Sequence, residues 1–205
     1  MSASQPKKRS NTPLILILLL SLAPVLAAFI VYYVPELQPE GSTNYGTLVQ
    51  PQRPMPATEQ LSLTTLDGKP FDINELKGQW LLVTADVGAC PEPCAKKLFI
   101  MRNTHAMMGK NVKRMARIWL VTDDAPIPEN VLEAYKGTIM LRADPNLIDT
   151  FFAGKDVVSA KDAALSDPIW VIDPLGNLMM QYPKDPDPLQ VRKDLGKLLH
   201  NSRIG

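Results

Sequence analysis

Two cysteines are the residues of this chain best suited to chemistry. Cys90 and Cys94 are its only cysteines, and they lie in the stretch "VGACPEPCAKK" at residues 87–97. Residues four apart in a first helical turn share one side of the helix, so the two sulfurs can form a disulfide or converge on one ion. The pair therefore predicts one of three things: thiol–disulfide exchange, metal binding by soft thiolates, or a structural disulfide.

The residues around the cysteines favour reactive thiols. The apolar run 80–86 predicts a buried strand, and the apolar spacing over 94–108 predicts a helix packed on one face. Free N–H groups and a partial positive charge at the start of a helix stabilise a thiolate and lower the pKa of a thiol. Lys96 and Lys97 add positive charge, which Glu92 opposes if its carboxylate faces the sulfurs.

Strand and helix patterns alternate through the rest of residues 61–205. A hairpin signal around Asp67-Gly68 comes first, and a strand–turn–strand unit followed by an amphipathic helix closes the chain. This order predicts an α/β domain with a mixed central sheet flanked by helices. The expected strands are 80–86, 117–124, 138–144, 168–173 and 178–183, and the expected helices are 94–108, 127–137, 145–152 and 187–200.

A single N-terminal segment has the features of a transmembrane helix. Residues 14–34 contain no charge, and at 1.5 Å per residue they span roughly 30 Å, the thickness of a bilayer core. The basic residues at 7–9 place the N-terminus in the cytoplasm and residues 35–205 outside. A cleaved signal peptide is the alternative. It has a shorter apolar region, and "LAA" at 26–28 is followed here by more apolar residues, which favours an uncleaved anchor.

The segment after this anchor is rich in proline and predicts a linker. Residues 35–60 carry five prolines, and fully extended they would reach about 80 Å. The expected organisation is a cytoplasmic N-terminus at 1–13, a transmembrane helix at 14–34, a linker at 35–60 and a globular domain at 61–205. In a bacterium this topology places the domain in the periplasm, tethered to the inner membrane, where disulfides persist. The net charge of +1 excludes a strongly basic nucleic-acid-binding surface.

Pro168 is a third candidate for the site. It comes directly before the apolar strand "IWVID". In the thioredoxin fold a cis proline sits at this place, faces the cysteine pair and leaves a slot where the backbone of a substrate can pair. A proline that merely begins a strand is the alternative interpretation.

Several motifs together resemble the Sco/SenC family, which comprises membrane-anchored, thioredoxin-like proteins of cytochrome c oxidase assembly. The family's C-P-acid-x-C segment is similar to "CPEPC" at 90–94, and its next strand ends in an acidic motif similar to "LVTDD" at 120–124. Its I-D-P-x-G turn is matched at 172–176. The likeness covers about residues 60–200, and the anchor and the proline-rich segment also fit. The resemblance implies a thioredoxin-like fold behind one transmembrane helix.

One departure from the family concerns copper. Family members bind copper through the two cysteines and a histidine whose place falls near Leu165, where this chain has none. Its two histidines are His105 and His200. His105 lies eleven residues beyond Cys94, roughly 16 Å along a helix, which is too far to share an ion with the cysteines. Two thiolates alone can still hold Cu(I), and one of the nine methionines is a weaker candidate for a third ligand.

Three functions remain open from the sequence. The first is a tethered thiol–disulfide oxidoreductase that needs no cofactor, with Cys90 attacking, Cys94 resolving and Pro168 supporting the substrate. By resemblance, its targets are cysteines of the copper site in a cytochrome c oxidase subunit, or of a copper chaperone. The second is a Cu(I) metallochaperone that uses Cys90 and Cys94 as metal ligands. The third is a non-catalytic assembly protein with a structural disulfide, although so short a loop contributes little chain entropy.

Overall fold

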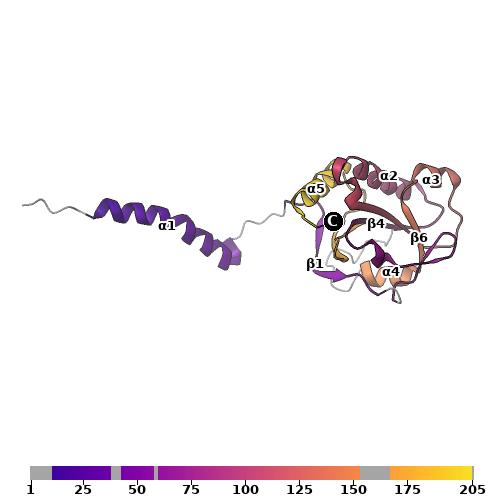
Figure 1. Cartoon of the computed structure of the whole chain (residues 1–205), viewed down its shortest axis with the longest axis horizontal. Coiled ribbons are helices and arrows are strands. Elements are labelled where there is room, and N and C mark those ends of the chain that lie inside the picture. Colours follow the sequence, from indigo (N-terminus) through magenta and orange to yellow (C-terminus); the bar gives the residue numbers. More distant parts are fainter. Residues whose placement is uncertain (1–10, 38–42, 58–59, 153–166, 205) are drawn as a thin grey trace, which may run out of the picture. The chain divides into compact units, whose positions relative to one another are not determined.

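A long apolar helix dominates the N-terminal unit of the protein. The computed structural model describes residues 11–37, 43–57, 60–152 and 167–204, in two units that divide after Thr43. Helix α1, Thr12–Tyr33, has a mean hydropathy of 3.0 and is long and apolar enough to cross a membrane (Figure 1). The predicted span 14–34 matches it within two residues, and Pro24 lies inside it. A short 3-10 turn, η1 (Pro35–Leu37), follows.

The second unit is built on one mixed sheet of eight strands. The strand order is β1-β8-β7-β4-β5-β6-β2-β3, in which β4, β5 and β6 are parallel and every other pair is antiparallel. The strands are β1 (Thr47–Pro54), β2 (Leu63–Thr65), β3 (Pro70–Phe71), β4 (Trp80–Asp86), β5 (Met115–Val121), β6 (Ile139–Ala143), β7 (Ile169–Ile172) and β8 (Asn177–Tyr182).

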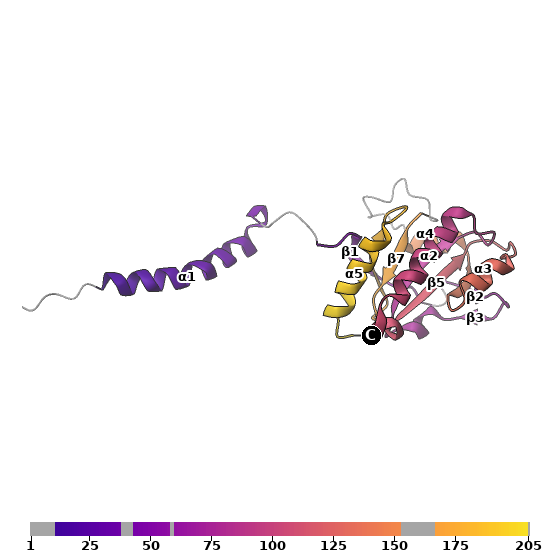
Figure 2. The same ribbon diagram turned by 90° about the horizontal axis from the view of Figure 1, so that it is seen from above.

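Helices cover both faces of this sheet, which confirms the predicted α/β architecture. Figures 1 and 2 show α2, α3 and α5 on one face and α4 on the other. Each α-helix described in residues 60–152 and 167–204 overlaps its expected range, although α3 is shorter than expected. The helices are α2 (Glu92–Ala106), α3 (Glu129–Ala134), α4 (Pro145–Phe152) and α5 (Pro188–Asn201), with 3-10 turns η2 (Ile73–Leu76) and η3 (Gly109–Arg114).

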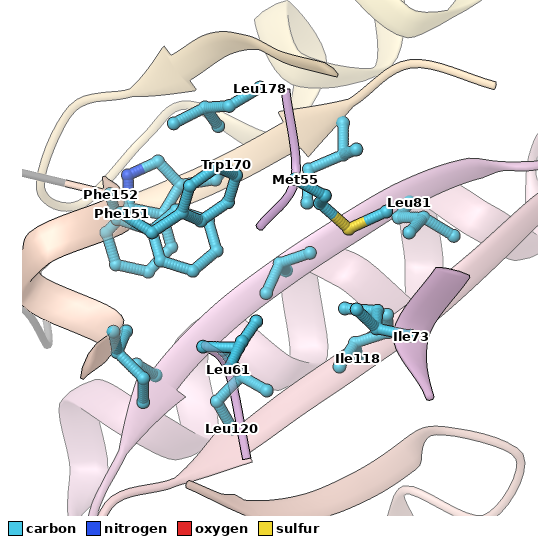
Figure 3. Close-up of a cluster of buried hydrophobic side chains, with 14 of the residues drawn as sticks. Met55, Leu61, Ile73, Leu81, Ile118, Leu120, Phe151, Phe152, Trp170 and Leu178 are labelled. Carbon is cyan, nitrogen blue, oxygen red and sulfur yellow. The ribbon is translucent and has the colours of Figure 1, made fainter. Parts of the chain in front are cut away.

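The central strand β4 divides the core between the two faces. All seven of its residues are buried, and successive side chains point to opposite faces of the sheet. Leu81 and Val83 join the cluster against α4, where the ring of Phe152 stacks on that of Trp170 with centroids 4.2 Å apart (Figure 3). Leu82 joins the cluster against α2 and α5. Since both faces are covered, the end of β4 is fixed, and the cysteine loop begins there.

The predicted linker 35–60 is too long, because part of it belongs to the sheet. β1 pairs with β8 at the edge of the sheet. The Asp194 carboxylate of α5 accepts hydrogen bonds from the backbone N–H groups of Tyr45 (2.6 Å) and Gly46 (2.8 Å), which fixes the chain just before β1. The prolines of this segment are compatible with a strand only because β1 is an edge strand with an irregular register. Proline content therefore indicated a linker where long-range pairing forms a strand.

The turn between β7 and β8 generates a test of the fold. Gly176 has a φ of +90°, and a Cβ there would lie 2.8 Å from Cε of Lys77. We expect Gly176→Ala to lower the free energy of unfolding by about 1–2 kcal/mol, because an L-residue is strained in this conformation. Urea unfolding measures the change. Leu175→Ala is the matched control, since Leu175 is 63% exposed in the same turn. Equal stability of the two variants would contradict this account of the turn.

Candidate functional site

The two cysteines form a disulfide at the start of α2. Cys90 lies in the loop after β4 and Cys94 in the first turn of the helix, with their Cα atoms 5.1 Å apart. The predicted proximity of the sulfurs is therefore confirmed. The two positions differ in access, because Cys90 is 8% exposed and Cys94 is completely buried. Any reactant from outside the protein thus meets Cys90 first.

The loop that carries Cys90 is fixed against the loop that follows β5. Cys90 has a φ of +44°, and its N–H donates to the Val87 carbonyl at 3.0 Å. The Gly88 N–H donates to Oδ1 of Asp123 at 2.7 Å. A Cβ at Gly88 would lie 2.6 Å from the Ala125 carbonyl oxygen, so only glycine allows this approach. The acidic motif noticed in the sequence contributes Asp123, which positions the loop.

The helix beneath the disulfide begins with prolines, as its sequence predicts. Pro91 is the N-cap of α2, and its carbonyl accepts the N–H of Ala95 at 3.0 Å. Pro93 lies in the first turn, where a missing N–H leaves no helical hydrogen bond unmade. The backbone N–H groups of this turn and the helix dipole lie where a Cys94 thiolate would form on reduction.

The inner side of the disulfide is apolar. Cys94 packs in a buried cluster with Leu98 of α2 and Trp119 of β5. Tyr135, which follows α3, belongs to the same cluster, and its hydroxyl donates to the Ala95 carbonyl at 2.8 Å. Water is therefore excluded from Cys94 on the side of the protein core.

A buried ion pair joins the end of β4 to α2. Nζ of Lys97 lies 2.9 Å from Oδ2 of Asp86 and donates to the Ala85 carbonyl at 3.2 Å. The side chains are only 5% and 7% exposed. Burial lowers the pKa of Lys97, and the Asp86 carboxylate opposes this shift. Lys97 was expected to add positive charge beside the sulfurs. The structure instead pairs it with Asp86, a residue that sequence reasoning did not single out.

A cleft of about 160 Å³, lined by charged residues and Pro93, opens beside the start of α2. Glu92 and Pro93, which lie between the cysteines, form part of its wall. Nζ of Lys96 lies 3.0 Å from Oδ1 of Asp185, and the two side chains are 55% and 62% exposed. The remaining wall consists of Lys97, Asp167, Lys184 and Asp185. Cys90 and Cys94 are not among the residues that line this cleft, although Glu92 and Pro93 lie between them in the chain.

Pro168 follows directly on a residue of this cleft wall. It is buried ahead of β7, and its carbonyl accepts a hydrogen bond from the hydroxyl of Thr84 in β4 at 3.4 Å. Within the described residues the cis peptide bond precedes Pro51, so the Asp167–Pro168 bond is trans. The structure therefore lacks the cis form of a thioredoxin-type proline at this position.

Two further expectations concern the histidines and a metal site. His105 lies in the last turn of α2, with Nε2 at 3.1 Å from the Met115 carbonyl oxygen, so it is separate from the cysteines as predicted. Burial lowers its pKa. The place of the family histidine, near Leu165, lies outside the described residues. Among the residues that the structure describes, no group of three or more His, Cys, Asp or Glu side chains could hold a metal ion.

Removing one partner of the buried ion pair tests its role. We expect Lys97→Met to destabilise the protein by about 3–5 kcal/mol, because Asp86 then stays buried without a counter-charge. The double variant Asp86→Asn with Lys97→Met should recover much of this loss. Chemical unfolding of both variants beside Lys96→Met, an exposed neighbour, measures the effect. If the double variant is no more stable than Lys97→Met alone, the unpaired charge of Asp86 is not the cause of the loss.

Solved structures share this fold at low sequence identity. The solution structure of apo Sco1 from Thermus thermophilus is 19% identical with a TM-score of 0.55, covering 79% of this chain and 98% of that one. The copper-bound crystal structure of yeast Sco1 is 14% identical with a TM-score of 0.52, covering 79% and 96%. A thiol:disulfide interchange protein of the thioredoxin family from Chlorobium tepidum is 21% identical with a TM-score of 0.52, covering 74% and 99%.

These likenesses confirm the thioredoxin-like fold and the resemblance to Sco/SenC proteins at the level of the fold. A search of curated protein sequences found no significant match. The model of one family, described as a transmembrane-like, thioredoxin-like C-terminal domain, matches residues 80–202, which is more than half of the chain. The matched region runs from β4 through the disulfide to the end of α5, and the chain therefore belongs to this family of transmembrane-like, thioredoxin-like C-terminal domains.

Proposed function

We propose that the protein is a membrane-tethered thiol–disulfide oxidoreductase that acts on cysteines of other proteins. One observation carries the proposal: at the N-terminus of a helix a disulfide joins Cys90, which is 8% exposed, to Cys94, which is completely enclosed. A disulfide with a purely structural role does not require one cysteine to be more accessible than the other. An exchange reaction uses it, because one sulfur must meet the partner while the other stays protected.

The chemistry follows in two balanced steps. In the reducing direction the Cys90 thiolate attacks one sulfur of a partner disulfide, forms a mixed disulfide and releases the partner's first thiolate. The Cys94 thiolate then attacks the Cys90 sulfur, which restores the Cys90–Cys94 disulfide and releases the second thiolate. Two electrons pass from the cysteine pair to the partner. The reverse sequence oxidises a partner dithiol, and the structure holds the oxidised form that would begin it.

The surroundings of the disulfide support these steps. The N-terminal turn of α2 stabilises negative charge on Cys94 when it forms or leaves as a thiolate. Tight packing with Leu98 and Trp119 keeps Cys94 in reach of Cys90. The cleft next to Glu92 and Pro93 would give the partner segment a place to lie. Pro168 follows Asp167 of the cleft wall and is proposed to support the partner backbone.

The tether and the fold support a location and a target. The apolar helix α1 would hold the domain at the inner membrane of a bacterium, with the N-terminus in the cytoplasm and the cysteines in the periplasm. The proposed partners are cysteines of a cytochrome c oxidase copper site, or of the copper chaperone that supplies it. This choice rests on the fold shared with Sco1 proteins and on the motifs quoted above.

Cu(I) transfer is the second candidate function, and the copper-bound structure of yeast Sco1 is the observation that favours it. Here Cu(I) would be cargo held between the thiolates of Cys90 and Cys94, which soft-ligand chemistry allows. Both sulfurs would first have to be reduced, since they are bonded to each other. The segment 153–168 contains no histidine to complete a three-ligand site of the family type.

Single-cysteine variants test the exchange mechanism. In Cys94→Ser the remaining Cys90 should form a mixed disulfide with an aromatic disulfide reagent about tenfold faster, or more, than Cys94 does in Cys90→Ser, because Cys94 is buried. Both variants should remain folded, since closing so short a loop stabilises by only about 2 kcal/mol. Absorbance of the released thiolate gives the rates. Equal rates, or unfolding of both variants, would favour a structural disulfide instead.

A competition experiment separates exchange from copper carriage. The reduced protein receives one equivalent of Cu(I) together with a calibrated chelator under anaerobic conditions. Loss of copper to the chelator supports the oxidoreductase. Retention of one Cu(I) per chain that disappears in either cysteine variant would overturn it in favour of the metallochaperone.

A further inference from the structure

A second and larger cleft lies at the carboxyl ends of strands β5 and β6. Its volume of about 470 Å³ falls in the range of about 300–1,000 Å³ that is typical of ligand sites. The chain leaves β5 toward α3 on one face of the sheet and leaves β6 toward α4 on the other (Figures 1 and 2). Parallel neighbours whose connections part in this way leave a crevice, which is where ligands of open α/β sheets bind. The fold thus creates this strand-end cleft, and its side chains determine what it can hold.

The side chains that line the strand-end cleft are mostly polar and carry more negative than positive charge. Asp123 and Asp124 follow β5, Asp144 precedes α4, and Arg142 belongs to β6. Three carboxylates and one guanidinium give the lining a net charge of −2 at neutral pH. Hydroxyl groups, which both donate and accept hydrogen bonds, add to the polar wall. They belong to Ser62, Thr64 and Thr122.

The positive charge in the lining is already used within the cleft wall. Nη1 of Arg142 donates to the carbonyl of Asp123, and Nη2 donates to that of Ala125 at 3.3 Å. None of the ion pairs within the described residues involves the three aspartates. Asp124 and Asp144 are exposed, so their carboxylates can meet a cation from outside the protein. The lining therefore disfavours an anion and suits a positively charged occupant.

The strand-end cleft shares a wall with the cysteine loop. Oδ1 of Asp123 accepts the N–H of Gly88 at 2.7 Å, and Gly88 lies two residues before Cys90. Because two residues span at most about 7 Å of backbone, this wall lies within roughly 10 Å of the Cys90 backbone. A chain of about three or four residues is long enough to join an occupant of the cleft to a sulfur bonded to Cys90.

We propose that the strand-end cleft binds a basic segment of the partner protein, with arginine or lysine side chains close in sequence to the partner's reactive cysteine. This specificity depends on the proposed thiol exchange, whose substrate class it defines. The guanidinium or ammonium groups pair with Asp124 and Asp144, and the hydroxyls of the cleft accept the remaining N–H groups. A segment held there brings its cysteine to Cys90, so partners are selected by their charge.

Exchange with three short peptides tests this specificity on the reduced full chain in detergent micelles. Each peptide carries one cysteine as a 2-thiopyridyl disulfide, flanked by two arginines, two glutamines or two glutamates. The Cys90 thiolate bonds to the peptide sulfur, the peptide–thiopyridyl bond breaks, and the absorbance of the released 2-thiopyridone gives the rate. At low ionic strength we expect the arginine peptide to react about tenfold faster than the glutamine peptide, and the glutamate peptide to be slowest. Added salt should remove most of the difference.

A double variant assigns this preference to the cleft. Asp124→Asn with Asp144→Asn removes two charges at nearly constant size, and asparagine can still accept the N–H of Asn146 that Asp144 accepts. We expect this variant to prefer the arginine peptide by about twofold or less, as screened surface charges do. The matched control is Glu75→Gln with Glu133→Gln, which removes the same charge from exposed positions outside the cleft. The control should keep the full preference.

The outcomes separate this specificity from the exchange reaction itself. Equal rates for the arginine and glutamine peptides, a preference that survives in the cleft variant, or an equal loss in the control would overturn the proposal. If no peptide reacts, the thiol-exchange function fails instead. The arginine peptide with serine in place of cysteine then tests the cleft directly, and saturable shifts of the Asp124 and Asp144 side-chain resonances uphold it. No shift, or an equal shift with free arginine, overturns it.

Discussion

The attachment of α2 to the end of β4 is the constraint on which the site depends. Asp86 is the last residue of the central strand, and Lys97 lies one turn beyond Cys94, so their buried ion pair joins the two elements across the cysteine loop. Separating the two side chains would leave an unpaired charge in the core, which is costly. The pair therefore holds the end of β4 and the first turns of α2 together. The loop between them is then fixed from the other side by Asp123 and Gly88. The start of α2 therefore leaves Cys90 slightly exposed and encloses Cys94 completely.

That geometry connects the fold to the proposed chemistry. Both cysteines belong to the apolar cluster around Trp119, but Cys90 keeps 8% of its surface exposed whereas Cys94 keeps none. The difference in access allows a partner thiol to distinguish the two sulfurs without any cofactor. With α1 in a membrane, as proposed, the domain would meet proteins at that same membrane.

Local sequence pattern was sufficient for most of the fold. The apolar run 80–86 predicted β4, and the hairpin signal around Asp67-Gly68 corresponds to the antiparallel pair β2–β3. The features that were missed depend on contacts between residues far apart in the chain. β1 was assigned to the linker because its prolines suggested an extended tether, and only pairing with β8 makes it a strand. Lys97 was expected near the sulfurs, but nothing local shows that Asp86 would bury and neutralise it. The cysteine pair itself was predictable, because its spacing and its place after a buried strand are local properties.

The reduction potential of the Cys90–Cys94 couple tests the central claim most directly. The purified protein would be equilibrated with glutathione buffers of graded potential, and the free thiols counted by alkylation and mass. A reversible exchange site should titrate as one two-electron couple between about −120 and −270 mV, the range of known thiol–disulfide oxidoreductases. A disulfide that stays intact until below about −300 mV, as structural disulfides of secreted proteins do, would contradict the account.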